Sequence, residues 1–243
     1  MNLIELKKIE KSFGKNKVLK NINLELPEGE VVAVMGPNGS GKTTMLKSIL
    51  GLVIPDSGKI YVKNKDSSID FNYRRNIGYM PQTANYPDNL KVSELFHIVK
   101  DIRGEDTQID EELVEEFRLR EIYNKYFGQL SGGYKQRVTG AIAFLFKPEI
   151  LILDEPTASL DPLSCEIMRK KIMKEKTKKR LIIITSHISA EAEELADRLI
   201  YILEGKIFIN KLMKEMVNGN GTLKLGLAIS KILENTGNKT EHN

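Results

Sequence analysis

The sequence predicts an α/β fold in which helices cover a parallel sheet. Three observations support this prediction. After Pro148, short apolar runs alternate with helical patterns, as is typical of a parallel sheet. Near the N-terminus, apolar and polar residues alternate along two segments, which predicts an antiparallel β subdomain. Between about residues 83 and 147, apolar residues recur at helical spacing, so we expect an α-helical subdomain inserted into the core.

The individual elements follow from the same patterns. The unbroken apolar run at residues 31–35 predicts a buried parallel strand, followed by a helix at 42–50 that ends at Gly51. The other predicted strands are 3–9, 18–26, 59–63, 76–80, 150–153, 181–185 and 199–203, and the later helices are 162–176 and 190–198. We expect residues 1–209 to form one domain and residues 210–243 a short C-terminal extension.

Composition limits the function only loosely. The 243-residue chain has a formal net charge of +4, a mild basic excess that fits nucleotides, acidic lipid surfaces or nucleic acid equally well. Its one cysteine, Cys165, cannot form an internal disulfide, which favours a reducing compartment. No apolar run reaches the roughly 20 residues that a membrane helix needs. A role at a membrane would therefore be exerted through another chain.

A glycine-rich loop lies between the predicted strand at 31–35 and the helix that follows. It has the P-loop pattern Gly-x-x-x-x-Gly-Lys-Thr, which predicts a P-loop NTPase core. Its backbone amides and the helix N-terminus would surround a phosphate of ATP. We expect Lys42 to reach the β- and γ-phosphates and Thr43 to bind Mg²⁺. The predicted nucleotide-binding residues here are Gly36, Pro37, Asn38, Gly39, Ser40, Gly41, Lys42, Thr43 and Thr44.

A second candidate site is the end of the predicted strand at 150–153. Asp154 and Glu155 follow this apolar run, at the carboxyl edge of the sheet, where ligands of parallel sheets bind. Asp154 suits the Mg²⁺ shell, and Glu155 is placed to polarise a water that attacks the γ-phosphate. An isolated acidic pair would more simply cap a helix or face solvent, but a P-loop in the same chain favours the catalytic interpretation.

A third candidate is Leu-Ser-Gly-Gly, ahead of a helical run. Ser131, Gly132 and Gly133 open that helix and predict a second phosphate-binding loop, although Ser131 is also an ordinary helix-capping residue. The chain would then have two phosphate-binding loops but one P-loop lysine. Both would be used if each loop completed the site of a partner across a symmetric interface.

The order of P-loop, Leu-Ser-Gly-Gly, Leu-Ile-Leu-Asp-Glu-Pro and a histidine after a strand resembles the ATP-binding subunit of ABC transporters. The resemblance covers roughly residues 1–209. It implies an ATPase that binds two Mg-ATP between two chains, as a homodimer or as a heterodimer with a second ABC ATPase domain. It further implies that hydrolysis, with Glu155 as the base, opens this dimer.

The resemblance also implies roles for residues outside the three motifs. Phe13 occupies the place of the aromatic residue that stacks on adenine, and Gln82 that of the glutamine that senses Mg²⁺ and the attacking water. Asp161 lies in the loop that crosses the dimer interface, and His187 matches the histidine that contacts the γ-phosphate. The residues after Gly133 depart from the commonest family pattern, but no expected catalytic position is missing.

The resemblance favours transport through separate membrane permease subunits, with this chain bound peripherally on the cytoplasmic side of the cell membrane. Residues 83–92 resemble the surface where a permease helix docks, with Tyr86, Pro87 and Leu90 as lining residues or as residues packed within the subdomain. Residues 76–90 look most like ATPases that serve the copper sites of nitrous oxide reductase. The alternative is a soluble ABC ATPase that acts without a permease, for example in iron–sulfur cluster assembly.

A basic cluster lies on the predicted helix at 162–176 and just after it. It has no interleaved aromatic residues, so we interpret it as a solvated face and expect no nucleic-acid partner. Its members are Lys170, Lys171, Lys174, Lys176, Lys178, Lys179 and Arg180.

Overall fold

Two sheets form the frame of the molecule. The computed structural model describes residues 1–104, 108–216 and 225–230. The first sheet is antiparallel with strand order β2-β1-β4-β5, and the second has the order β10-β9-β3-β8-β7-β6. In the second sheet all pairs are parallel except β9 with β10. The predicted combination of an antiparallel β subdomain with a parallel sheet is therefore confirmed.

The strands keep close to their predicted places. The antiparallel sheet consists of β1 (Asn2–Phe13), β2 (Asn16–Pro27), β4 (Ser57–Val62) and β5 (Lys65–Asp66). The larger sheet consists of β3 (Val31–Met35), β6 (Ile77–Met80), β7 (Ile150–Asp154), β8 (Leu181–Thr185), β9 (Arg198–Leu203) and β10 (Lys206–Leu212). Every residue of β3, β7 and β8 is buried, as their unbroken apolar runs predict.

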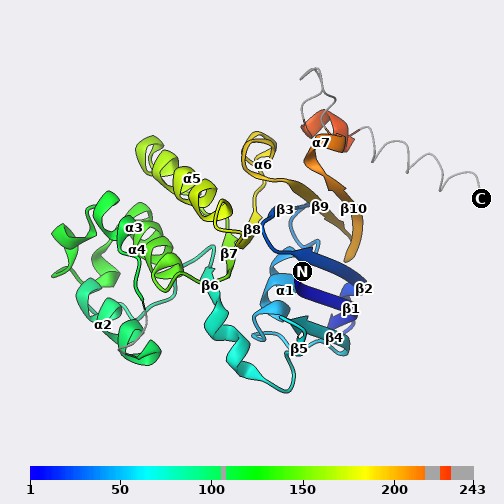
Figure 1. The fold of residues 1–243 in the computed structure, drawn as a ribbon, viewed down its shortest axis with the longest axis horizontal. Helices are drawn as coiled ribbons and strands as arrows, with labels where there is room; N and C mark the ends of the chain where they lie inside the picture. The colour runs from blue at the N-terminus through cyan, green and yellow to red at the C-terminus, as the bar shows by residue number, and fades with distance from the viewer. Residues whose placement is uncertain (105–107, 217–224, 231–243) are drawn as a thin grey trace, which may run out of the picture.

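The helices fall into two groups. Those of the core are α1 (Lys42–Ile49), α5 (Pro162–Lys176), α6 (Ser189–Leu195) and α7 (Met213–Met216). The inserted subdomain holds α2 (Val92–Arg103), α3 (Glu112–Glu116) and α4 (Gly132–Phe144), with 3₁₀ turns at Leu119–Ile122 and Phe127–Gln129, whereas a further 3₁₀ turn at Phe71–Asn76 precedes β6. Figure 1 shows α2, α3 and α4 at one end of the molecule and the antiparallel sheet at the other.

Some elements differ from the predictions, among them β5 and α7, which were not predicted. The predicted helix at 190–198 ends at Leu195, and residue 198 already belongs to β9, because Asp197 donates its backbone N–H to the carbonyl of Val31 and enters the sheet. β10 was not predicted, and it runs past residue 209 to Leu212. It turns back from β9 through Glu204 and Gly205, both with positive φ.

The period of two along the parallel strands divides their side chains between two cores. In β3, Val31, Ala33 and Met35 face the core shared with the inserted helices, whereas Val32 and Val34 face the core shared with α1 and the antiparallel sheet. The central sheet is thus covered on both faces and offers only its strand ends to a ligand. No helix of the described residues is long and apolar enough to cross a membrane.

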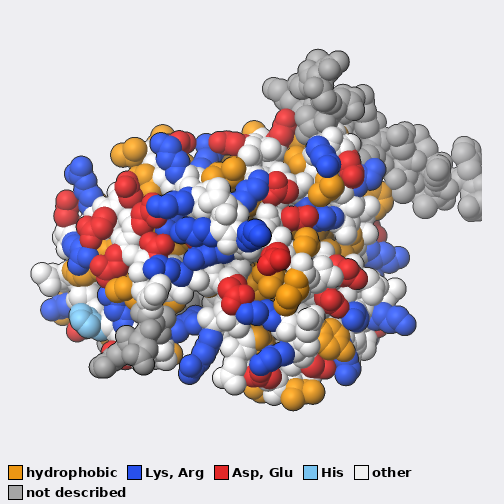
Figure 2. Space-filling model, in the orientation of Figure 1, with side chains coloured by type: hydrophobic (Ala, Val, Ile, Leu, Met, Phe, Trp, Pro, Cys, Tyr) orange, Lys and Arg blue, Asp and Glu red, His pale blue; other side chains and the backbone are white. Residues whose placement is uncertain are grey.

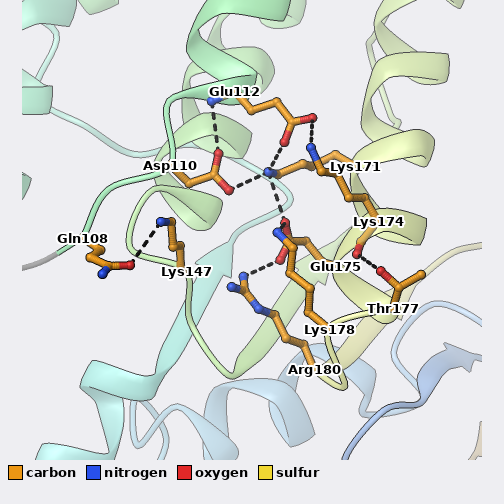
Figure 3. A network of polar contacts seen from close by, with 10 residues as sticks. All are labelled: Gln108, Asp110, Glu112, Lys147, Lys171, Lys174, Glu175, Thr177, Lys178 and Arg180. Carbon is orange, nitrogen blue, oxygen red and sulfur yellow. Dashed lines mark hydrogen bonds and ion pairs between the residues drawn. The ribbon is translucent and has the colours of Figure 1, made fainter.

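A buried ion network joins the inserted subdomain to α5 (Figure 3). Only 2% of the Lys171 side chain is exposed, and its Nζ lies 2.7 Å from Asp110, 2.6 Å from Glu112 and 3.1 Å from Glu175. Glu175 is fully buried and also pairs with Arg180. The prediction that this basic cluster is a solvated face is therefore wrong for Lys171, because carboxylates from α3, from the residues just before it and from α5 surround its ammonium group.

Candidate functional site

The glycine-rich loop joins the end of β3 to the start of α1, as predicted. Gly36 has a φ of +144°, and a Cβ there would lie 2.1 Å from the carbonyl oxygen of Ile202, so only glycine fits. Gly41 precedes α1 with a φ of +107°. The Nζ of Lys42 donates to the carbonyl oxygens of Gly36 at 2.7 Å and Pro37 at 3.0 Å. The lysine is therefore held across the loop that would receive the phosphates.

The acidic pair lies beside this loop, at the carboxyl end of β7. Asp154 is 4% exposed, and this burial raises the pKa of its carboxyl, while a hydrogen bond from Thr185 opposes the rise. Burial likewise lowers the pKa of Lys42, although the charges of Glu155 and Asp154 partly restore it. Because Lys42 and Asp154 affect one another's protonation, the P-loop cation and the acidic strand end form one electrostatic unit.

A cleft of about 320 Å³ brings most of the predicted site together. Its lining residues come from the hairpin between β1 and β2, the P-loop with α1, the segment after β6, and the end of β7. They are Phe13, Asn16, Val18, Asn38, Gly39, Gly41, Lys42, Thr43, Thr44, Gln82, Asp154 and Glu155. Phe13 is 53% exposed, so one ring face is available for stacking.

His187 stands at the edge of this cleft. It follows β8, its side chain is 69% exposed, and its Nδ1 lies 3.4 Å from Oε1 of Glu155. A histidine and a carboxylate at this distance can share a proton or jointly orient a water. The structure thus places His187 next to the residue predicted as the base.

The Ser131 loop and Asp161 do not line the cleft. Ser131 precedes α4 as its N-cap, but among the described residues its side chain makes no capping hydrogen bond, and Ser131 and Gly132 are exposed. Asp161 caps α5 by accepting from Ser164 and pairs with Arg137. These bonds, that from Ser164 foremost, hold the pKa of Asp161 well below its usual range.

Residues 83–92 divide between surface and core. Tyr86 packs edge-on against Phe127 with ring centroids 5.2 Å apart, and burial raises the pKa of Tyr86 to about 12. Leu90 packs against the core shared with the inserted helices, whereas Pro87 is exposed. Leu90 therefore packs within the subdomain, whereas Tyr86 has both roles, because it also lines, with Pro87, an open pocket of about 700 Å³.

Two residues near the acidic pair were not predicted. The hydroxyl of Thr185 donates to Oδ1 of Asp154 and accepts the backbone N–H of Glu155 at 2.9 Å. Gln136 of α4 donates from Nε2 to the carbonyl oxygen of Glu155 at 3.1 Å. The sequence offers a weak signal for each, because Thr185 ends a parallel strand and Gln136 follows the Ser131 loop closely.

The donor set of the cleft suits Mg²⁺. Thr43, Gln82 and Asp154 offer a hydroxyl, an amide oxygen and a carboxylate oxygen in one cleft, and Mg²⁺ prefers oxygen ligands. Among the described residues no group of three or more His, Cys, Asp or Glu side chains could hold a metal by itself. The remaining ligands would therefore be phosphate oxygens and water, as Mg²⁺ sites beside nucleotides require.

The strand-loop-helix with its lysine, next to an acidic strand end, defines a nucleotide-binding ATPase of the P-loop class. Within that class the chain belongs to the ABC transporter family, whose model matches residues 19–158. It is an ATP-binding, ATP-hydrolysing protein of the kind that serves transporters. The resemblance noted in the sequence is thereby confirmed at the level of the family.

Similar proteins include the lantibiotic transport ATP-binding protein SrtF of Streptococcus pyogenes, 36% identical, with 86% of this chain and 90% of that protein covered. The lipopolysaccharide export system ATP-binding protein LptB of Haemophilus influenzae is 32% identical, with 90% and 94% covered. Among solved structures, an ATP-binding subunit of an ABC transporter matches with a TM-score of 0.87 at 27% identity, covering 95% of this chain and 99% of that one. A dimeric ATP-binding cassette in a post-hydrolysis state with ADP and Pi matches with a TM-score of 0.78 at 29% identity, covering 86% and 98%.

Proposed function

We propose that this chain hydrolyses ATP to drive transport through separate membrane permease subunits, bound peripherally at the cytoplasmic side of the cell membrane. The permease part of the proposal rests on the similarity to transport ATP-binding proteins. One observation carries the ATPase part. The cleft holds the P-loop and the acidic pair, while the exposed Ser131 loop lies outside it. A second ATPase domain, supplied by another copy of this chain or by a homologous chain, would bring its own Ser131 loop to the nucleotide. Dimeric cassettes among the similar structures support this arrangement.

The residue roles follow from the cleft. Phe13 stacks on adenine, the P-loop amides and Lys42 bind the phosphates, and the partner's Ser131, Gly132 and Gly133 cap the γ-phosphate. Thr43, Gln82 and Asp154 hold Mg²⁺, which neutralises phosphate charge when it is bound. Asp161 contributes to nucleotide binding from the loop that crosses the dimer interface.

Glu155 acts on the attacking water. Its carboxylate, with His187 at 3.4 Å, accepts a proton from a water aligned with the γ-phosphate. Once the γ-phosphate has left, the contact between the P-loop of one chain and the Ser131 loop of the other is lost, and the dimer opens. ATP therefore favours the closed dimer and hydrolysis releases it.

The extent of the ATPase domain belongs to the same proposal. The sequence predicts a domain of residues 1–209, with the helical subdomain inserted at about 83–147 and residues 210–243 as a short extension. Because β10 continues the sheet to Leu212 and Met213 and Met216 of α7 are buried in its core, we extend the proposed domain to residue 216. The likeness of residues 76–90 to ATPases of nitrous oxide reductase maturation stays a prediction.

The test is Glu155→Gln, which keeps the shape and hydrogen-bonding capacity of the side chain but removes the base. We expect ATP binding to persist, turnover to fall by about 100-fold or more, and the dimer to remain closed with ATP. ATP binding, ATPase rate and size-exclusion chromatography with and without ATP measure these three properties. Hydrolysis at the parental rate would show that Glu155 is not the base.

The permease part of the proposal has its own test. We expect the tagged chain, purified from solubilised membranes, to bring down a multispanning membrane protein. Purification with soluble partners alone would favour the ATPase that acts without a permease, as in iron–sulfur cluster assembly.

A further inference from the structure

Gln136 connects the helix that follows the Ser131 loop to the backbone of Glu155. It lies early in α4, and only 5% of it is exposed. Its Nε2 donates a 3.1 Å hydrogen bond to the carbonyl oxygen of Glu155. Since α4 belongs to the inserted helices and Glu155 follows β7 of the core, this bond crosses from one subdomain to the other.

The backbone of Glu155 needs such support. Its φ of +53° is in the left-handed region, which a side-chain-bearing residue keeps only where its surroundings hold it. The N–H of Glu155 donates to Thr185, and its carbonyl accepts from the N–H of Ala158 at 3.1 Å and from Gln136. Of these three bonds, only that of Gln136 comes from the inserted helices.

α4 also contacts the segment that follows Glu155. Arg137, the next residue after Gln136, pairs with Asp161. A Cβ at Gly133 would lie 3.0 Å from the carbonyl oxygen of Ser159, which shows how closely the first turn of α4 approaches the same segment. α4 therefore contacts both ends of segment 155–161, through Gln136 at Glu155 and through Arg137 at Asp161. A shift of α4 must displace the Glu155 peptide or break the Gln136 bond.

We infer that Gln136 is a positioning residue. Its bond to the backbone of Glu155 fixes the position of the Glu155 carboxylate and thereby couples the two ATP sites of the dimer. This inference rests on the proposed function. The Ser131 loop of a chain engages the partner's nucleotide, whereas Glu155 of that chain acts at the chain's own nucleotide. Gln136 joins the two within one chain, so engagement at one site aligns the base at the other. Gln136 does not line the nucleotide cleft, so its loss should change the rate of hydrolysis and leave ATP affinity unchanged.

The experiment uses mixed dimers of the full-length chain with a single working base. One chain carries Glu155→Gln and the other is parental at that position, so that only the second chain hydrolyses its ATP. Gln136→Met, which keeps the length of the side chain but removes the donor, is placed in either chain. Single-turnover hydrolysis is measured on the closed dimer loaded with ATP, together with ATP affinity. We expect a decrease of about tenfold when the substitution is in the chain with the working Glu155, and a parental rate when it is in the other.

Thr139→Val is the matched control, because the Thr139 hydroxyl makes a buried 2.7 Å bond to the carbonyl of Lys135 on the same helix and does not reach Glu155. Dimers that carry Thr139→Val should hydrolyse ATP at the parental rate. If Gln136→Met does not fold, Gln136→Leu replaces it. A parental rate in both arrangements, or a defect when the substitution sits opposite the working base, would overturn the inference. Failure of the parental chain to dimerise with ATP would instead refute the proposed function.

Discussion

The hydroxyl of Thr185 lies between the two acidic residues at the end of β7. It donates to Asp154 and accepts from the N–H of Glu155, and Thr185 is only 1% exposed. Motif spacing predicts Asp154 and Glu155 but not this threonine, because a β-branched residue at the end of a strand looks like an ordinary strand former. Its role becomes visible only when β8 lies beside β7.

Thr185→Val should destabilise the protein, since it keeps the shape of the side chain but leaves the Glu155 N–H and one Asp154 oxygen without this partner. A buried polar group without a partner costs about 1–3 kcal/mol. For a chain of this length that lowers Tm by roughly 2–4 °C per kcal/mol, which thermal unfolding followed by circular dichroism will measure. Thr185→Ser keeps the hydroxyl and is the control. Equal melting of the valine variant and the parental protein would contradict the bridging role.

At the scale of elements, the ion pairs around Lys171 connect α5 to the inserted subdomain. Burial raises the pKa of the Asp110 carboxyl, but the hydrogen bond from Lys171 and that from the Glu112 N–H outweigh this effect and lower the pKa overall. Burial likewise lowers the pKa of Lys171, and its three carboxylate partners more than reverse it, so the net pKa is raised. The network therefore holds charged groups in place across the joint between α3 and α5.

Lys171→Met should destabilise the protein by about 3–5 kcal/mol at neutral pH, because it leaves buried carboxylates without their counter-charge. Urea unfolding followed by circular dichroism measures the change. Lys174→Met is the control, since Lys174 is 53% exposed and its pair with Glu112 is worth at most about 1 kcal/mol. Similar losses for the two variants would show that burial of Lys171 does not matter.

The contribution of the Asp110–Lys171 pair to stability depends on pH with a definite sign. The pKa of Asp110 is lower in the folded chain, so its contribution to stability is present above the unfolded value of about 3.9 and is lost as pH falls through the folded value. The difference in stability between the parental protein and Lys171→Met should therefore shrink as pH falls below about 4. A difference that stays constant down to acid unfolding would contradict this linkage.

The elements also show how far sequence patterns reach. β3, β7 and β8 were predictable because strands buried on both faces are unbroken apolar runs. β10 was missed because its turn through Glu204 and Gly205 lacks the Asn-Gly or Asp-Gly pair that usually marks a tight hairpin. The burial of Lys171 could not be predicted, because Asp110 and Glu112 lie 61 and 59 residues away in the chain. The cleft itself could be predicted from the sequence, since most of its residues belong to motifs with fixed spacing.

At the scale of the whole molecule, one chain presents two surfaces that we propose are the halves of two ATP sites. The P-loop cleft and the Ser131 loop lie on different subdomains and share no lining residue within the described cleft. On the face shown in Figure 2, Lys and Arg side chains lie intermixed with Asp and Glu, so on this face charge does not separate one half of the molecule from the other. If the two half-sites work only when two chains pair, the P-loop of each chain depends on the Ser131 loop of its partner.

Mixed dimers test this dependence directly. Lys42→Ala removes the phosphate-binding lysine, and Ser131→Arg places a bulky cation in the second loop; we expect each variant alone to lose most ATPase activity. When the two are mixed, one site of each hybrid dimer joins an intact P-loop to an intact Ser131 loop. With random pairing about a quarter of all sites are restored, so the ATPase rate should recover to about that fraction of the parental value. A mixture as inactive as its components would mean that each chain builds its ATP site from its own residues.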